Sequence, residues 1–449
     1  MMHVSGDTIA AIATPQGRGG IGVIRISGEA VPALLTPLLG KIPEPRYASF
    51  GGFLDRHGQA IDQGLALYFP APHSFTGEHV LELHAHGSPV VLDLILERLI
   101  QLECRLARPG EFSERAFLNR KIDLAQAEAI ADLIDSATAS AARAAQRSLK
   151  GVFSDQIHAL VEALIELRLL IEAAIDFSDE EIDFLTEAKV IDQLKALEQQ
   201  LTSIKSLALK GQRLREGATL VLAGRPNAGK SSLLNRLAGE DRAIVTPIPG
   251  TTRDTLREAI QLGGIPLHII DTAGLRDNAT DPVEREGIQR TRAAITVADL
   301  ILLVIDDNEA TPDDALIDAL PDGIPVILIH NKIDLSGRTP GRVISDEGIH
   351  VRVSLKSGDG IDDLFMVLAD QLGIEPEQAG SFTARRRHLE ALEAALSGVL
   401  GAQRECQAGS QDLAAEQLRL SQRALSEITG DFSSDDLLGR IFASFCIGK

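Results

Sequence analysis

The chain has 449 residues, of which 44% are apolar and 24% charged, as in an average soluble globular protein. At about 150 residues per domain, this length predicts about three domains and excludes a single small fold. The net charge of −20 excludes a generally basic nucleic-acid coat and a polybasic membrane-surface protein. Of the 20 excess negative charges, 16 lie within residues 119–379.

The three cysteines, Cys104, Cys406 and Cys446, lie far apart and show no metal-ligand spacing. They predict no disulfide framework, which fits a reducing compartment. No apolar run approaches the ~20 residues that cross a bilayer, and the first residues lack the pattern of a secretory signal. We therefore expect a cytoplasmic protein with no membrane segment.

Residues 1–118 mix short strand-like runs with helix-like stretches, separated by Gly and Pro. This pattern predicts a compact α+β domain. The expected strands cover residues 8–13, 21–26, 64–69 and 80–84, and the expected helices cover residues 30–39 and 89–102.

The composition and the spacing of apolar residues then change: residues 119–212 contain no proline and repeat apolar residues at helical spacing. The same pattern returns in residues 380–449. Between them, residues 213–379 alternate apolar, buried-type strands with helices, which is typical of a mostly parallel sheet. The sequence thus predicts a multidomain α/β protein in which this α/β domain is inserted into a helical domain.

A phosphate-binding loop opens the inserted domain. Strand-like Thr219–Ala223 leads into Gly224–Ser231, which fits GxxxxGK[ST], and helix-like Ser232–Ala238 follows. In such a loop the backbone amides approach the phosphates. We expect Lys230 to reach the β- and γ-phosphates and the hydroxyl of Ser231 to bind Mg²⁺.

A guanine-recognition motif follows a later strand. Asn331–Asp334 fits NKxD, and a carboxylate at Asp334 can accept hydrogen bonds from both N1–H and the exocyclic amine of guanine. Adenine offers an acceptor at N1, so this carboxylate discriminates against it. Ser354–Lys356 lies where such domains place a third base-contacting loop, although it also reads as an ordinary turn.

Two further motifs lie between these. Asp271–Gly274 ends a strand-like run, and we expect Asp271 to hold Mg²⁺ through water and the amide of Gly274 to sense the γ-phosphate. Thr251–Asp254 follows a stretch punctuated by Pro and Gly, so Thr252 is the second Mg²⁺ candidate. Four motifs in this order predict a GTPase.

The residue after Asp271–Gly274 is Leu275, where a water-orienting Gln is common in Ras-like proteins. Because an apolar side chain cannot orient water, another group must do so. Glu284 is the candidate catalytic residue, although by spacing alone it also fits a charged helix start.

With these motifs placed, the chain resembles the tRNA-modification GTPase family called MnmE or TrmE over essentially its whole length. Outside the GTPase motifs the resemblance rests on Thr8–Pro15, Gly17–Gly20, Arg108–Ser113, Asp123–Glu128 and the terminal Phe445–Lys449.

The resemblance implies an N-terminal tetrahydrofolate-binding and dimerisation domain (1–118), a helical domain in two parts (119–212 and 380–449) and an inserted GTPase domain (213–379). It implies a homodimer that works with an FAD-dependent partner of the MnmG or GidA family, in a heterotetramer or larger complex. Together they would add an aminomethyl or carboxymethylaminomethyl group to C5 of the wobble uridine, position 34, of certain tRNAs.

The resemblance also assigns sites residue by residue. It implies K⁺ ligands at Asn227, Thr246, Ile248 and Thr251. It matches Glu284 to a water-organising glutamate. It places 5-formyl-tetrahydrofolate, or another one-carbon tetrahydrofolate, at Arg25, Glu82, Lys121 and Lys449. The expected GTP-binding residues are Asn227, Ala228, Gly229, Lys230, Ser231, Ser232, Thr246, Thr251, Thr252, Asp271, Thr272, Ala273, Gly274, Asn331, Lys332, Asp334, Ser354, Leu355 and Lys356.

Alternatives remain at several points. A GTP-dependent ribosome-assembly switch would share the GTPase motifs, but it leaves residues 1–118 and the C-terminal tail unexplained. Gly17–Gly22 fits the dinucleotide motif GxGxxG, but a strand-like run follows it rather than a helix. His84 and His86 are expected to be ordinary strand histidines. Cys446 could be structural or catalytic, and we favour a structural role because no base is adjacent.

Overall fold

The computed structural model describes residues 6–176, 187–225, 227–239, 258–271, 298–308, 323–345, 348–373, 382–431, 435–443, 445 and 448. The chain divides into two compact units, which are described separately. The first comprises Met1–Ala131, Ser148–Glu198 and Ala394–Lys449, and the second comprises Asp132–Arg147 and Gln199–Glu393.

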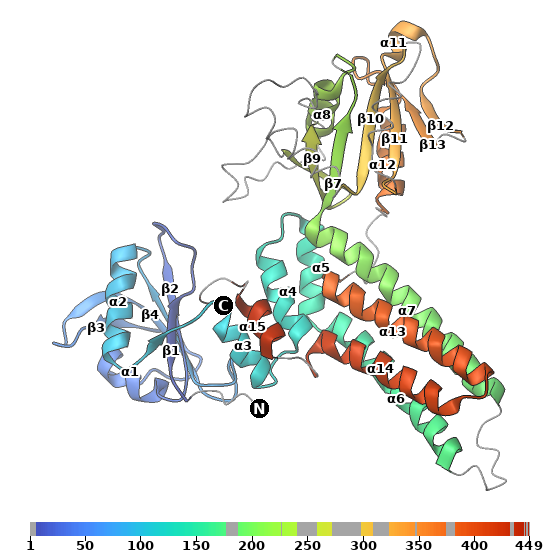
Figure 1. Cartoon of the computed structure of the whole chain (residues 1–449). Helices are drawn as coiled ribbons and strands as arrows, with labels where there is room; N and C mark the ends of the chain where they lie inside the picture. Colours follow the sequence, from blue (N-terminus) through green and yellow to red (C-terminus); the bar gives the residue numbers. More distant parts are fainter. Residues whose placement is uncertain are drawn as a thin grey trace, which may run out of the picture. The chain divides into compact units, whose positions relative to one another are not determined.

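The first unit contains a six-stranded sheet of order β3-β4-β5-β2-β1-β6, in which β1 and β6 are parallel and the other neighbours antiparallel (Figure 1). The strands are β1 (Ile9–Ile12), β2 (Gly22–Ser27), β3 (Ser49–Leu54), β4 (Ala60–Phe69), β5 (Val80–Ala85) and β6 (Arg105–Leu106). The helices that accompany them are α1 (Val31–Leu39), α2 (Pro89–Gln101) and α3 (Glu111–Leu118).

Successive side chains of a strand point to opposite sides of the sheet. Different helices pack against its two faces. Ile24, Ile26 and Leu83 belong to the same apolar core as the buried residues of α1 and α2. On the other face, Ile9 packs with Phe112 of α3. The alternation therefore places Arg25 and Glu82 on the face that carries α3.

A buried ion network fixes the start of α3. Arg115 is 3% exposed and donates to Asp7, Glu78 and Glu111. Burial raises the pKa of the Glu111 carboxyl, but hydrogen bonds from Arg105, from the Arg108 amide and from Arg115 outweigh it and hold that pKa at about 2. Glu111 is therefore charged at neutral pH and ties α3 to the strands.

Long helices complete the first unit, and some continue into the second. The helices are α4 (Leu124–Ile134), α5 (Ala139–Leu149), α6 (Val152–Asp176), α7 (Glu187–Glu216), α13 (Arg386–Gln407), α14 (Gln411–Thr429) and α15 (Asp435–Ala443). Arg168 of α6 donates to Gln422 of α14 at 2.7 Å, so two helices far apart in sequence lie side by side (Figure 1). No described helix is long and apolar enough to cross a membrane.

The second unit contains a seven-stranded sheet of order β12-β13-β11-β10-β7-β9-β8. Its five central strands are parallel, and the edge strands β8 and β12 are antiparallel to their neighbours. The strands are β7 (Ala218–Ala223), β8 (Glu258–Leu262), β9 (Ile265–Asp271), β10 (Leu300–Asp306), β11 (Val326–Asn331), β12 (Gly341–Ser345) and β13 (Gly348–Arg352).

Helices α8 (Lys230–Gly239) and α12 (Ile361–Gln371) share one apolar core with this sheet, and the short α11 (Ile333–Ser336) follows β11. The carboxyl ends of β7, β10, β11 and β13 meet at one edge of the sheet. In open parallel sheets this is the edge at which ligands bind. The multidomain α/β architecture and mostly parallel sheet predicted from sequence are confirmed.

A pair of glycines facing each other across β3 and β4 gives a test of the N-terminal sheet. Gly51 pairs with Gly64, but a Cβ on Gly64 would lie 2.0 Å from the carbonyl oxygen of His84, whereas a Cβ on Gly51 would meet only Lys41 Cε at 3.9 Å. We expect Gly64→Ala to destabilise the protein by about 1–3 kcal/mol because backbone must shift. Gly51→Ala, the matched control, should be neutral or slightly stabilising. Urea unfolding measures both, and equal effects would contradict the packing described.

Candidate nucleotide site and N-terminal pocket

The phosphate loop connects β7 to α8. Lys230 is the first residue of α8, and its side chain folds back so that Nζ donates to the carbonyl oxygens of Gly224 (2.7 Å) and Arg225 (3.0 Å). Asn227 has a left-handed backbone with φ 65°, and the exposed Ser231 and Ser232 follow in the first turn of the helix. The amino end of α8 therefore faces the loop, as phosphate binding requires.

Asn331 joins the phosphate loop to the two base-recognition segments. Its side-chain amide donates to the carbonyl oxygen of Ala228 at 2.8 Å, and its Oδ1 accepts from the amide of Leu355 at 3.2 Å. Asn331 is 4% exposed, so both bonds lie out of water. This one side chain brings together three sequence motifs, of which the phosphate loop lies more than 100 residues before the other two.

Asp334 and Ser354, two of the residues predicted to contact guanine, lie side by side. Ser354 is fully buried, and its hydroxyl donates to Oδ1 of Asp334 at 2.8 Å. Asp334 is exposed, so its carboxylate remains open to a ligand. Leu355 and the exposed Lys356 follow in the same loop. The structure thus places the predicted third base-contacting loop beside Asp334.

Two acidic residues at the end of β10 were not predicted from the sequence. Asp306 accepts from Nζ of Lys332 at 2.6 Å, and this hydrogen bond lowers the pKa of the Asp306 carboxyl. The buried Asp307 accepts from Ser336 and Arg338, which follow the NKxD motif. The two carboxylates brace the segment on both sides of Asp334. The only sequence signal was their position after a buried strand.

His330 lies directly before the NKxD motif and is hydrogen-bonded to His350 of β13 at 3.0 Å. Burial and the neighbouring His350 lower the pKa of His330, so this imidazole is neutral near pH 7. The pair adds a side-chain link between adjacent strands beneath the guanine loop.

Several predicted residues lie outside the described part of the chain, and Asp271 is described only as the last residue of β9. The residues outside are Thr246, Ile248, Thr251, Thr252, Thr272, Ala273, Gly274, Glu284 and Lys449.

A second polar cluster lies on the sheet face of the first unit that carries α3. Arg25 and Glu82 are paired in the register of β2 and β5, and their side chains form an ion pair at 2.8 Å. The Arg25 guanidinium lies 5.6 Å from the ring centre of Phe75 and 5.8 Å from that of Phe112. Each ring attracts the cation, so the two aromatics hold its position. Neither ring was assigned to this site from the sequence.

Lys121 reaches the loop that carries Phe75, because its Nζ donates to the carbonyl oxygen of Pro72 at 2.9 Å. His84 lies on the same strand face as Glu82, with Nε2 3.8 Å from the Glu82 carboxylate. That buried nitrogen has no hydrogen-bond partner among the described residues. The cluster therefore holds a cation, a carboxylate and an unsatisfied imidazole nitrogen, which suit a ligand with both an anionic tail and polar ring groups.

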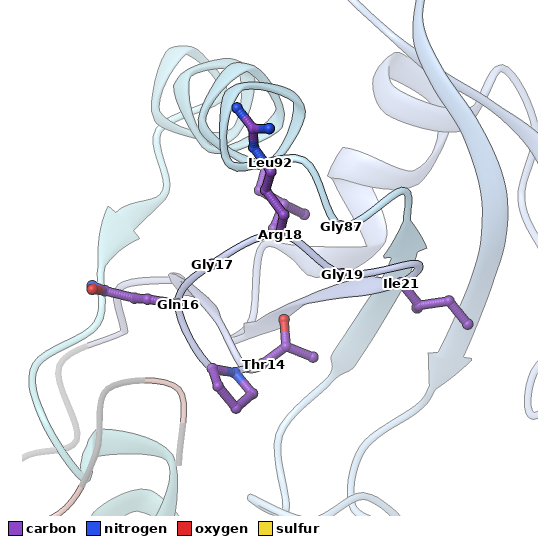
Figure 2. A pocket seen from close by; sticks show the side chains of 10 residues that line it. Thr14, Gln16, Gly17, Arg18, Gly19, Ile21, Gly87 and Leu92 are labelled. Atoms are coloured by element: carbon purple, nitrogen blue, oxygen red, sulfur yellow. The ribbon is translucent and has the colours of Figure 1, made fainter. Parts of the chain in front are cut away.

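The glycine-rich segment after β1 curves around a separate hollow of about 270 Å³ (Figure 2). Thr14, Gln16, Arg18, Gly19, Ile21 and Leu92 are among the residues that line it, and the side chains of Gln16 and Ile21 extend in opposite directions. Strand β2 follows the segment, so the expectation that no helix follows this GxGxxG match is confirmed.

His86 pairs with Asp62 at 2.8 Å, and the described residues contain no cluster of His, Cys, Asp or Glu able to hold a metal ion.

The fold and the nucleotide site define the class of this protein: it is a P-loop GTPase with additional domains. Two family descriptions match the chain, "GTP-binding protein TrmE N-terminus" over residues 8–121 and "MnmE helical domain" over residues 124–446. The chain belongs to the MnmE family of tRNA modification GTPases.

Individual relatives agree. The chain is 57% identical over 443 residues to tRNA modification GTPase MnmE of Methylococcus capsulatus, with 99% of each chain covered. It is 56% identical over 446 residues to the protein of the same name from Hydrogenovibrio crunogenus, again with 99% of each covered. Among solved structures, the G domain of the T. maritima FeoB iron transporter is 25% identical over 34% of this chain and 98% of that one, with a TM-score of 0.26.

Asp334 gives the test of the nucleotide site. Asp334→Asn replaces a carboxylate that accepts from two guanine donors by an amide that accepts from only one. We expect GTP affinity to fall roughly 10- to 100-fold, the value of a hydrogen bond to a charged group. Binding of xanthosine triphosphate should rise, because its O2 accepts from the new amide. Titration with both nucleotides measures the change. Asp362→Asn, in the exposed first turn of α12, is the control and should alter neither affinity.

Proposed function

We propose that this GTPase is activated by K⁺ and that, with a flavin-dependent partner of the MnmG or GidA family, it adds an aminomethyl or carboxymethylaminomethyl group to C5 of the wobble uridine in certain tRNAs. GTP hydrolysis drives the association of two GTPase domains and a conformational change. The observation that carries the proposal is the joining of phosphate and guanine motifs through Asn331, in a chain of the MnmE family.

GTP binding follows from the arrangement of described side chains. Lys230 exchanges its two carbonyl partners for phosphate oxygens, and Asp334 accepts from the guanine edge while Ser354 orients it. Ser231 stands in the first helical turn and supplies a hydroxyl to Mg²⁺, with Thr252 as the second ligand. When bound, Mg²⁺ neutralises charge on the β- and γ-phosphates.

Hydrolysis needs a group that orients water, because Leu275 cannot. We assign this role to Glu284. Asn227, Thr246, Ile248 and Thr251 are the proposed K⁺ ligands, and Asn227 lies in the phosphate loop with an exposed side chain. When bound, K⁺ supplies the positive charge that an arginine finger supplies in other GTPases.

The N-terminal cluster is proposed to bind 5-formyl-tetrahydrofolate or another one-carbon tetrahydrofolate. Arg25 and Lys121 meet the anionic glutamate tail, Glu82 accepts from the pterin, and Lys449 completes the set. The unsatisfied nitrogen of His84 supports this proposal, because a polar ring atom of the ligand would satisfy it.

The proposed organisation is a folate-binding and dimerisation domain (1–118), a helical domain (119–212 and 380–449) and an inserted GTPase domain (213–379). The protein acts as a homodimer in a heterotetramer or larger complex with its partner. Because the helical and GTPase segments are acidic, we propose that the partner supplies much of the surface that binds tRNA. The relatives' names concern tRNA modification, so no observation favours the ribosome-assembly alternative.

Nucleoside analysis tests the assignment. Bulk tRNA from a strain that lacks this gene should lose the C5-modified wobble uridine, and a plasmid carrying the wild-type gene should restore it. Lys230→Ala, which removes the phosphate-binding ammonium, should fail to restore it. Unchanged wobble uridines in the deletion strain would refute the proposed function.

The cation dependence of hydrolysis tests the K⁺ proposal separately. We expect GTP turnover at least tenfold faster in KCl than in NaCl at equal ionic strength, about 1.4 kcal/mol of transition-state stabilisation. Asn227→Ala should abolish this preference because it removes a ligand to the ion. Steady-state phosphate release measures both, and equal wild-type rates in the two salts would eliminate the K⁺ mechanism.

A further inference from the structure

A buried carboxylate in α4 binds two arginines that flank the nucleotide-binding part of the chain. Oδ1 of Asp132 accepts from Nε of Arg215 at 2.7 Å and from Nη2 of Arg385 at 2.8 Å. The Asp132 side chain is 5% exposed. Both hydrogen bonds are charge-assisted, and the carboxylate that accepts them is buried, so they are stronger than bonds between fully exposed charges.

One arginine precedes the first strand of the seven-stranded sheet, and the other follows α12, the helix that comes after its last strand. Arg215 lies at the end of α7, directly before β7, and Arg385 lies directly before α13 (Figure 1). Segments more than 160 residues apart thus converge on one oxygen atom. We name these three residues the Asp132 clasp.

A second contact ties the neighbouring strand to the same helical segment. Thr138 lies between α4 and α5, and its hydroxyl donates to the carbonyl oxygen of Gly264 at 2.7 Å. Gly264 is in the tight turn between β8 and β9, and a Cβ there would lie 2.4 Å from Oγ of Ser140. The turn therefore rests directly on the start of α5.

The two strands that follow these contacts, β7 and β9, run toward the edge of the sheet where the nucleotide is expected to bind. β7 begins after Arg215 and ends at the phosphate loop, and β9 begins after Gly264 and ends at Asp271. β7 and β9 are hydrogen-bonded neighbours in parallel register. At about 3.3 Å per residue, each spans roughly 20 Å between the helical contact and the nucleotide edge. The two strands therefore connect the contacts with the helical segment to the edge of the sheet where the nucleotide is expected.

The clasp is not enclosed on every side. A hollow of about 170 Å³ lies beside it, lined by Asp132, Asp135, Ser136, Arg215, Glu216 and Thr383 among others. Arg215 borders this hollow, and its side chain, which is 31% exposed, is not packed on every side. A charge-assisted contact beside unfilled space can hold α4, α7 and α13 in one arrangement and still allow that arrangement to change.

We propose that Asp132 is a positioning residue that transmits the nucleotide state from β7 and β9 to helix α4. Asp132 is not among the residues expected to contact the nucleotide. This inference rests on the proposed use of GTP hydrolysis to drive a conformational change. Loss of the clasp should uncouple hydrolysis from tRNA modification rather than abolish hydrolysis.

Asp132→Asn tests the coupling, with Asp135→Asn as the matched control on an exposed residue just beyond α4. Purified full-length Asp132→Asn should hydrolyse GTP within about twofold of wild type. In the deletion strain, its restoration of the modified wobble uridine should be at least tenfold lower than that of wild type. Asp135→Asn should match wild type in both assays.

The outcomes separate the two claims. If the wild-type gene itself restores no modified uridine, the proposed function is wrong, and that failure is independent of the Asp132 clasp. If wild type restores it and Asp132→Asn does so equally well, the clasp inference is overturned. Loss of GTP hydrolysis along with modification also overturns it, since Asp132 would then simply support the nucleotide site.

A distance measurement distinguishes positioning from general destabilisation. Spin labels at Gln146→Cys in α5 and Met366→Cys in α12 occupy exposed sites in the second unit, while Cys104 and Cys406 are buried. With Cys446 replaced by serine, the folded protein should give a narrow distance distribution that changes between GDP and a transition-state analogue. Asp132→Asn should broaden it and remove that change. A narrow, nucleotide-responsive distribution in this variant would contradict the inference.

Discussion

The nucleotide site depends on the two hydrogen bonds of the Asn331 side chain. A phosphate loop and a guanine-binding carboxylate are useful only at a fixed separation, because one nucleotide must reach both. Asn331 sets that separation by bonding the carbonyl of Ala228 on one side and the amide of Leu355 on the other. An amide is suited to this position because it offers a donor and an acceptor on one planar group. Its burial makes both bonds costly to break.

The motifs of the nucleotide site could be predicted from sequence because their chemistry demands particular residues at fixed spacing. The strands that carry them were also predictable, since β7, β10 and β11 are continuous apolar runs buried on both faces. Asp306 and Asp307 could not be predicted, because a carboxylate after a strand has no required partner until the fold brings Lys332 and Ser336 beside it.

In the first unit, strand β3 and helix α3 were not predicted from the sequence, and each has a specific reason. β3 has adjacent glycines, Gly51 and Gly52, which weaken any strand signal. α3 has no polar outer face, because Glu111, Ser113 and Arg115 are buried. A periodicity rule that assigns charged residues to the surface therefore misses this helix. The aromatic rings around Arg25 come from segments 37 residues apart, and only the folded sheet brings them together.

The way in which Lys230 folds over its own loop has a consequence for how phosphate is received. The ammonium already bonds the backbone carbonyls of Gly224 and Arg225, so it would give up these bonds to reach a phosphate oxygen. At this nitrogen atom, phosphate binding would then exchange one pair of hydrogen-bond acceptors for another. The net free energy of that exchange would be the difference between phosphate and carbonyl oxygens as partners of the ammonium, and not the full value of a new hydrogen bond.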